Sequence, residues 1–147
     1  MPQEKIYQKI LIPLDTTPTD QVILNHIRPL ARLTGAMLIL VHVADGYGAR
    51  LQKELNLADS EEINEDRAYL KKISDQLKSE GFKTKDFLLA GEPAQKILDF
   101  AHEQECDLIA MATHGHRFIK DLLLGSVAEH IRHRTSIPIL MLRAPIH

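Results

Sequence analysis

The stretch DLIAMATHGHRFIKDLLLGS, residues 107–126, decides the fold. It opens with a short apolar run from Leu108 to Met111, which is typical of a buried strand. A loop begins at Ala112 and extends to Gly125 and Ser126, where an amphipathic helix starts. A helix N-terminus leaves backbone N–H groups unpaired, and the helix dipole favours an anion there. The stretch therefore predicts a strand, a glycine-containing loop and a helix start that together bind a phosphate.

The regions on either side repeat this alternation of strand and helix. Apolar runs predict four further strands, at residues 9–14, 36–43, 82–90 and 138–142. Apolar residues at helical spacing predict helices at residues 18–34, 59–80, 94–104 and 126–134. Residues 44–58 are expected to form the longest loop, with a short helical turn near residues 51–55. The strand at 82–90 is more polar than the others, which places it near an edge of the sheet.

The first helix carries its own start and stop signals. Thr17 is the predicted N-cap and Pro18 the first helical residue. Pro29 is expected to kink the helix or split it in two, because proline removes a backbone hydrogen bond. Gly35 is expected to close it as a C-cap.

Strict alternation of strands and helices, with strands apolar on both faces, indicates an α/β fold. The expected architecture is a three-layer sandwich, a parallel sheet with helices on both faces. In such sheets a ligand binds beyond the carboxyl ends of the strands, where the strand order reverses. The two most suggestive strand ends are residues 13–16 and 112–115. If these strands are neighbours, their loops form one crevice.

Composition limits the range of functions. A chain of 147 residues without an internal linker suits a single domain spanning residues 1–147. Its formal net charge of −2 argues against nucleic acid as the main partner. The apolar runs are shorter than the roughly 18 residues that a membrane span requires. With a single cysteine, and no apolar signal-peptide core at the N-terminus, a cytoplasmic location is expected.

Six segments along almost the whole chain resemble those of single-domain universal stress proteins: ILIPLD, LILVHV, AGEPAQKIL, CDLIAMATHGHR, LLLGSVAEHI and SIPILMLR. Members of this family that bind ATP carry the motif G-x2-G-x9-G-[ST]. Here the motif is Ala112, Gly115, Gly125 and Ser126, with the correct spacing and an alanine in place of the first glycine. The resemblance implies a five-stranded parallel sheet in the order 3-2-1-4-5.

The resemblance also implies ATP or AMP, with Mg²⁺ accompanying the phosphates, at the ends of the first and fourth strands. By analogy, Asp15 accepts hydrogen bonds from ribose hydroxyls, while Pro13 and the backbone of Val43 contact the adenine. The glycines and Ser126 line the phosphates, and Val127 contributes a backbone N–H. The candidate nucleotide-binding residues are Pro13, Asp15, Thr16, Val43, Met111, Ala112, Gly115, His116, Gly125, Ser126 and Val127.

Several of these residues have a purely structural alternative. Asp15 and Thr16 could serve as turn residues that bond nearby backbone N–H groups. Ser126 and Glu129 form an S-x-x-E pattern, typical of a helix capping box. The methyl group of Ala112 could crowd a ligand, so weakened binding is expected rather than none. No carboxylate or cysteine completes a metal site around the histidines, so no metal ligands are predicted.

A binding role is favoured over turnover, since the sequence offers no evident general base and no lysine of a P-loop motif. No catalytic residue is predicted, and any ATP hydrolysis is expected to be slow. The first hypothesis is a nucleotide-dependent signalling or dimerisation module of the stress response. Its homodimer would form through the segment PILML, which begins at Pro138 and ends at Leu142, and its protein partners are unidentified. The alternative is a nucleotide-free interaction protein of the same fold.

Overall fold

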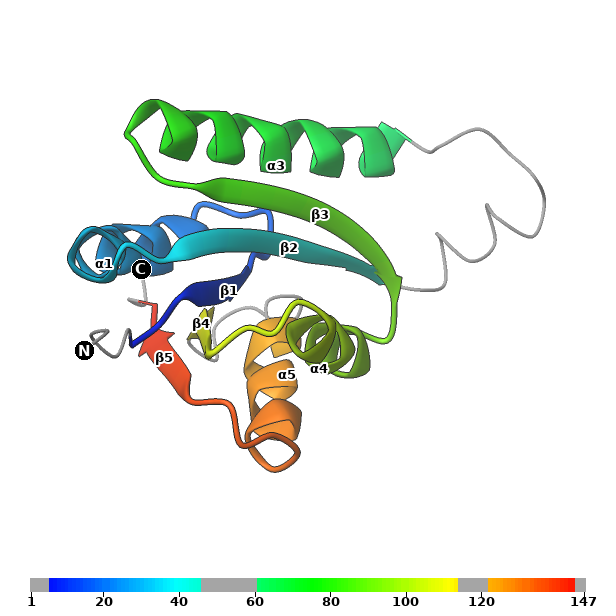
Figure 1. The fold of residues 1–147 in the computed structure, drawn as a ribbon. Coiled ribbons are helices and arrows are strands. Elements are labelled where there is room, and N and C mark those ends of the chain that lie inside the picture. The colour runs from blue at the N-terminus through cyan, green and yellow to red at the C-terminus, as the bar shows by residue number, and fades with distance from the viewer. Residues whose placement is uncertain (1–5, 46–60, 114–121, 145–147) are drawn as a thin grey trace.

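The structure, a computed structural model, describes residues 6–45, 61–113 and 122–144. Strands and helices alternate along these residues (Figure 1). The strands are β1 (Lys9–Pro13), β2 (Met37–Asp45), β3 (Thr84–Gly91), β4 (Leu108–Thr113) and β5 (Ile139–Arg143). The helices are α1 (Asp20–Thr34), α3 (Glu61–Ser79), α4 (Pro93–Glu103) and α5 (Leu122–Arg132).

The described strands form one parallel five-stranded sheet in the order β3-β2-β1-β4-β5, as the resemblance implied. β1 pairs with β2 on one side and with β4 on the other. The chain order therefore reverses at β1, and the carboxyl ends of β1 and β4 are neighbours. The expected crevice between the first and fourth strand ends thus lies at the topological switch point of the sheet.

Helices cover both faces of the sheet, which makes the predicted three-layer sandwich (Figure 1). Alternate residues of each central strand point to opposite faces, so each face has its own core. Ile10 and Ile12 pack with α1 and α3, whereas Leu11 packs with α4 and α5. Each of these β1 side chains is fully buried, and such burial contributes about 1.5–3 kcal/mol per side chain.

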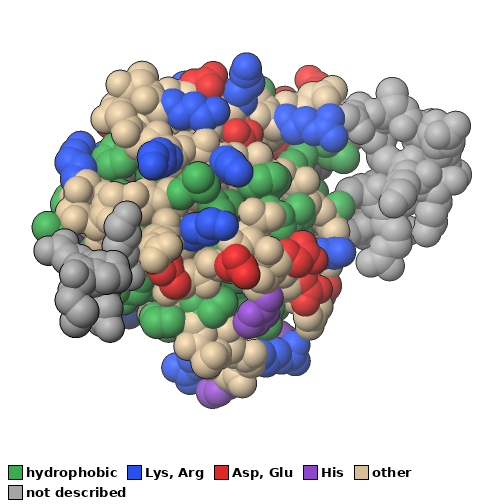
Figure 2. Space-filling model, viewed as in Figure 1, with side chains coloured by type: hydrophobic (Ala, Val, Ile, Leu, Met, Phe, Trp, Pro, Cys, Tyr) green, Lys and Arg blue, Asp and Glu red, His purple; other side chains and the backbone are tan. Residues whose placement is uncertain are grey.

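The α3 helix follows the predicted amphipathic pattern. Leu70, Ile73 and Leu77 are buried against the sheet. Lys71, Lys72 and Asp75 are exposed to solvent. Figure 2 shows positive and negative side chains interspersed on this side of the molecule. The charges of α3 therefore form its solvated face.

The start of α1 differs from the prediction. The helix begins at Asp20, with Thr19 as its N-cap residue and no side-chain capping bond. Thr17 does not cap the helix, because its buried Oγ1 has no hydrogen-bond partner in the described structure. Backbone bonds such as Asp20 N–H to Thr17 O, 3.0 Å, instead form a tight turn before the helix. The predicted split at Pro29 is wrong, since this exposed proline lies inside a continuous helix.

Other boundaries also differ. The α5 helix begins at Leu122, four residues before the predicted start at Ser126, because three leucines, good helix formers, precede Gly125. β4 continues to Thr113, so Ala112 lies within the strand and not in a loop. β5 runs from Ile139–Arg143, one residue later at each end than predicted. Gly35 closes α1 as expected, with a φ of 71° and its N–H bonded to Ala31 O. The helical turn expected near residues 51–55 lies outside the described residues.

Candidate functional site

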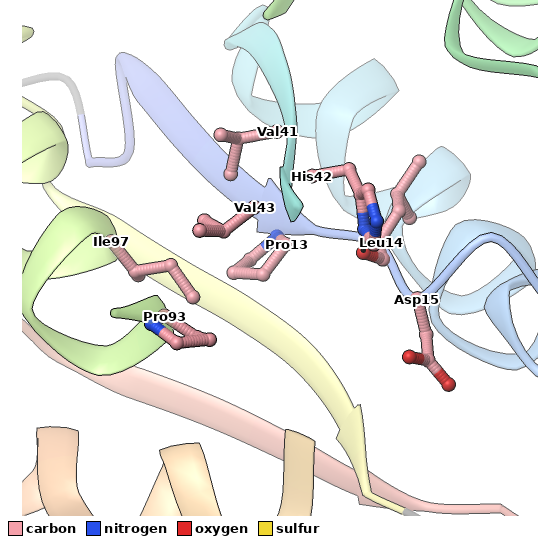
Figure 3. A pocket seen from close by; sticks show the side chains of 8 residues that line it. All are labelled: Pro13, Leu14, Asp15, Val41, His42, Val43, Pro93 and Ile97. Carbon is pink, nitrogen blue, oxygen red and sulfur yellow. Dashed lines mark hydrogen bonds between the residues drawn. The ribbon is translucent and has the colours of Figure 1, made fainter. Parts of the chain in front are cut away.

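A small pocket lies at the carboxyl ends of β1 and β2, against the start of α4 (Figure 3). Figure 3 shows the side chains of Pro13, Val43, Pro93 and Ile97 facing one another across it, while that of Asp15 points away from them. The complete lining comprises Pro13, Leu14, Asp15, Val41, His42, Val43, Pro93 and Ile97. The pocket therefore combines an apolar wall with one carboxylate at its margin, a pattern common in ligand sites.

The pocket is narrow. Its volume is about 10 Å³, which is room for about one water molecule. A larger ligand can enter only when the lining side chains move apart.

The start of α4 is well defined beside this pocket. Glu92 is its N-cap, and the side chain accepts hydrogen bonds from the N–H groups of Ala94, at 3.2 Å, and Gln95, at 2.7 Å. Pro93 stands at the start of the helix, where its missing N–H costs nothing. The capping interaction thus fixes one wall of the pocket.

The turn from β1 to α1 is held by the carboxylate of Asp20. Its Oδ1 accepts a hydrogen bond from the N–H of Asp15 at 2.8 Å, and its Oδ2 from the N–H of Thr16 at 2.9 Å. Asp20 is 1% exposed. Burial raises the pKa of its carboxyl group, and the hydrogen bonds from Asp15, Tyr69 and Thr16 partly oppose that rise. Asp20 therefore performs the turn-forming role that the sequence offered as an alternative for Asp15.

Two further side chains belong to this turn. Tyr69 of α3 donates from its hydroxyl to Asp20 Oδ2 at 2.8 Å. Burial and the neighbouring Asp20 charge raise the pKa of Tyr69 well above its ordinary value, so the phenol stays protonated. His42 of β2 places Nδ1 2.7 Å from the carbonyl oxygen of Leu14. The sequence pattern did not mark His42 or Tyr69. It marked Asp20 only as the third residue of the first helix, where an acidic side chain is favourable.

The structure brings together some of the predicted nucleotide-binding residues. Pro13, Asp15 and Val43 line the pocket, and Thr16 directly follows Asp15 with a left-handed φ of 60°. Its hydroxyl donates to the carbonyl oxygen of Asp15 at 2.6 Å. The first-strand part of the predicted site is thus a single structural unit.

Met111 and Ala112 of β4 are buried in the two cores. Met111 packs with the α4 and α5 side of the sheet, and Ala112 with the α1 and α3 side. Ala112 is 1% exposed and its methyl group contacts the core rather than the pocket. The methyl group of Ala112 is therefore not part of the pocket lining.

The remaining predicted residues follow β4. Gly115 and His116 lie outside the described residues. Gly125, Ser126 and Val127 lie inside α5, and Val127 is buried in the core. Ser126 is the fifth residue of the helix, so the S-x-x-E pattern is not a capping box at its start. Only the first four N–H groups of a helix lack an internal partner, and that of Val127 is the sixth.

Two other features are absent from the described residues. No group of three His, Cys, Asp or Glu side chains in residues 6–45, 61–113 and 122–144 could hold a metal ion. In the same part of the chain, none of the helices is long and apolar enough to cross a bilayer.

Comparison with known proteins agrees with this fold. The sequence model of the universal stress protein family matches residues 6–143. Universal stress protein MJ0531 of Methanocaldococcus jannaschii is 30% identical over 145 residues, which cover 97% of this chain and 85% of the relative. Universal stress protein MJ0577 of the same organism is 28% identical over 155 residues, covering 94% and 96% of the two chains.

Solved structures show the same similarity. The structure of MJ0577 matches with a TM-score of 0.80 at 29% identity, over 97% of this chain and 99% of the other. The universal stress protein of Archaeoglobus fulgidus in complex with dAMP matches with a TM-score of 0.68 at 25% identity, over 92% and 98% of the two chains. The sequence match, the strand order and these structural matches lead to one conclusion: the chain belongs to the universal stress protein family.

Proposed function

We propose that this protein binds an adenine nucleotide, ATP or AMP, beyond the carboxyl ends of β1 and β4. The single observation that supports this most is the pocket at the carboxyl ends of β1 and β2, next to the switch point of the sheet, with an apolar wall and Asp15 at its margin. The relative from Archaeoglobus fulgidus was solved in complex with dAMP, an adenine nucleotide. Occupancy of the site would then set a signalling conformation or a dimer in the stress response.

The proposed contacts follow from the chemistry of each group. Pro13 and Val43 provide apolar surface for the adenine ring. The carboxylate of Asp15 is an acceptor with two oxygens, suited to the hydroxyl groups of a ribose. Thr16 adds a second polar group beside it. Together these groups would bind the nucleoside half of the ligand.

The phosphates would lie towards the segment after β4. Gly115, His116, Gly125, Ser126 and Val127 are the candidates there, with Mg²⁺ accompanying the phosphates. Since α5 begins at Leu122, the first turn of this helix would have to unwind before the N–H of Val127 could reach a phosphate. Ala112 would support this end from within the core, because its methyl group points away from the pocket.

Binding without rapid turnover is the proposed activity, with any ATP hydrolysis slow. Phosphoryl transfer is accelerated by a cation and a positioned base near the γ-phosphate. The sequence contains no P-loop lysine to supply that cation. The nucleotide would therefore act as a stabilising ligand.

A second candidate is an interaction protein of the same fold that binds no nucleotide. The narrow pocket, of about 10 Å³, favours it. So does the α5 helix that begins before Gly125. In that case Asp15 and Thr16 would serve the turn between β1 and α1 alone.

The two candidates differ in a simple biochemical test. The protein is purified without added ligand and denatured, and the supernatant is chromatographed for adenine nucleotide. In parallel, thermal midpoints are recorded with millimolar Mg-ATP or AMP. Released nucleotide or a raised midpoint supports the proposal, because a ligand that binds only the folded state stabilises it. If neither is observed, the nucleotide-free candidate is the better description.

Gly125→Val is the variant that tests the phosphate end. We expect it to abolish the rise in thermal midpoint with Mg-ATP while leaving the circular dichroism spectrum close to that of the wild type. An unchanged ligand response in this variant would place the phosphate site elsewhere.

A further inference from the structure

The β1–α1 turn, residues 14–16, has three backbone groups that are bonded to side chains from outside it. The carbonyl oxygen of Leu14 faces Nδ1 of His42 at 2.7 Å. The N–H groups of Asp15 and Thr16 donate to the carboxylate of Asp20, at 2.8 and 2.9 Å. Because a carbonyl oxygen only accepts, Nδ1 of His42 carries the hydrogen. The position of this turn thus depends on two side chains, His42 and Asp20.

Both of these side chains in turn face side chains of α3. Oδ2 of Asp66 lies 3.5 Å from Nε2 of His42, a contact that is an ion pair when the imidazole is protonated. The hydroxyl of Tyr69 donates to Oδ2 of Asp20 at 2.8 Å and also to the carbonyl oxygen of Thr17 at 3.2 Å. Asp66 and Tyr69 are three positions apart, so they lie on one face of the helix. One helix face therefore holds both side chains that fix the turn.

The turn needs this support because its conformation is unfavourable. Thr16 has a φ of 60°, a left-handed conformation that a β-branched residue rarely adopts. Such a conformation persists only where the surrounding structure imposes it. The bond from its own N–H to Asp20, which Tyr69 orients, is the constraint that acts on this residue directly.

From this arrangement we infer that α3 positions the ligand-binding turn. The pairs Tyr69–Asp20 and Asp66–His42 set where the carboxylate of Asp15 lies, and so how tightly the protein binds the ribose of a nucleotide. This inference rests on the proposed function. Tyr69 and Asp66 are positioning residues in it, since they act on the ligand only through the turn.

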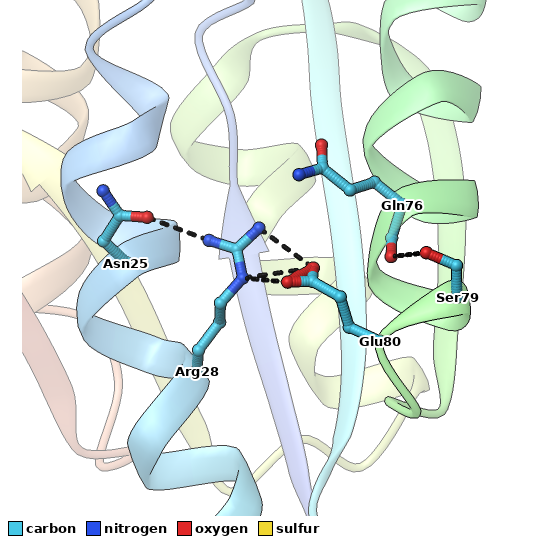
Figure 4. A network of polar contacts seen from close by, with 5 residues as sticks. All are labelled: Asn25, Arg28, Gln76, Ser79 and Glu80. Atoms are coloured by element: carbon cyan, nitrogen blue, oxygen red, sulfur yellow. Dashed lines mark hydrogen bonds and ion pairs between the residues drawn. The ribbon is translucent and has the colours of Figure 1, made fainter.

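A second link between α1 and α3 offers a control. Nε of Arg28 lies 3.0 Å from Oε1 of Glu80, and Nη1 of Arg28 donates to Asn25 Oδ1 (Figure 4). Glu80 directly follows the end of α3, whereas Tyr69 lies in its middle and bonds next to the turn. Glu80→Gln therefore weakens the attachment of the same two helices without touching the turn.

The test compares Tyr69→Phe with Glu80→Gln by measuring affinity for AMP and for 2′,3′-dideoxy-AMP, which lacks both ribose hydroxyls. Tyr69→Phe is expected to lower the affinity for AMP about fivefold to tenfold, which corresponds to the free energy of one hydrogen bond. It should leave the affinity for the dideoxy compound nearly unchanged. Asp66→Ala, which removes the partner of His42, should act in the same direction, and Glu80→Gln should alter neither affinity. If Tyr69→Phe loses the same affinity for both nucleotides, or loses none for AMP, the inference is overturned.

An independent measurement needs no nucleotide. Amide hydrogen exchange at Asp15 and Thr16 should be faster in Tyr69→Phe than in the wild type, and unchanged in Glu80→Gln. Unchanged exchange in Tyr69→Phe would show that α3 does not hold the turn. If the wild type fails to bind AMP, the proposed function is lost, and these exchange rates still decide whether the turn depends on α3.

Discussion

The carboxyl group of Asp20 is almost completely buried, yet it accepts hydrogen bonds from two backbone N–H groups and one phenol. Loss of water favours its neutral form, whereas the donors favour its charged form. Burial is the larger effect and raises the pKa above the ordinary value of 3.8. The folded state therefore holds this proton more tightly than the unfolded state.

This difference predicts a pH dependence. The contribution of Asp20 to stability is full below pH 3.8 and is lost as pH rises through its pKa in the folded state. The Asp20→Asn variant has no ionisable side chain at this position. The difference in free energy of unfolding between wild type and variant should therefore shrink from pH 4 towards neutrality. The change is about 1.4 kcal/mol for each tenfold difference in proton affinity between the folded and unfolded states. Urea unfolding at several pH values measures it, and a difference that grows with pH would refute the prediction.

Cys106 is a buried thiol, 6% exposed, and burial raises its pKa to about 11. At pH 8 only on the order of one thiol in a thousand is then the reactive thiolate. We expect a disulfide reagent to modify the native protein at least tenfold more slowly than the urea-unfolded protein. Equal rates in the two states would show that the thiol is accessible.

Ala112 illustrates what the sequence could not decide about the site. Glycine is the expected residue there, and the concern was that a methyl group would crowd the ligand. The direction of that methyl group depends on whether residue 112 continues the alternation of a strand. Because β4 extends to Thr113, Ala112 shares the face of Ala110 and points into the core. The two residues by which β4 exceeds the predicted strand thus determine the direction of this methyl group.

At the scale of single elements, the cap of α4 is the clearest local feature. Glu92 accepts hydrogen bonds from two N–H groups at the start of the helix. Glu92→Ala should destabilise the protein by about 1 kcal/mol, the typical value of an N-cap. Glu103→Ala is a matched control in the last turn of the same helix, where the carboxylate is exposed. Urea unfolding compares them, and equal effects of the two substitutions would contradict a capping role.

Element type could be predicted from periodicity throughout the described residues, whereas the starts of α1 and α5 could not. The predicted start of α1 is wrong because Asp20 bonds the turn at residues 15–16 and Tyr69 on α3, contacts that a local pattern does not contain. The predicted start of α5 is wrong because Gly125 was interpreted as the end of a loop, although the residues before it favour a helix. The strands were easier to predict from the sequence, because central strands that are buried on both faces give continuous apolar runs.

For the whole molecule, the strand order follows from the alternation of elements and the family resemblance. The pocket lies at the ends of β1 and β2, not between the ends of β1 and β4 where the sequence placed the crevice. The polar contacts that hold the β1–α1 turn behind this pocket could not be predicted from the sequence pattern either. They join His42 to Asp66, 24 positions later, and Asp20 to Tyr69, 49 positions later, and no short motif spans such separations. These contacts determine the conformation of the β1–α1 turn.

The proposed homodimer is also a property of the whole molecule. β5 lies at the edge of the sheet, and Met141 in it is 41% exposed. Met141→Lys should convert the dimer into a monomer, because the charge would be buried without a partner. Leu33→Lys on α1 is the control, since Leu33 is 85% exposed and lies outside β5. Sedimentation equilibrium measures the mass, and a monomeric wild type or a dimeric Met141→Lys would contradict the proposal.

Nucleotide binding at Asp15 is the central claim, and equilibrium binding to nucleotide-free protein tests it most directly. Isothermal titration calorimetry with AMP and with Mg-ATP should show one saturable site per chain. Asp15→Asn should weaken binding by roughly tenfold or more, the scale of a hydrogen bond to a charged group. Asp75→Asn, at an exposed carboxylate on α3, should bind as the wild type does. No saturable binding, or equal binding by Asp15→Asn, would contradict the account.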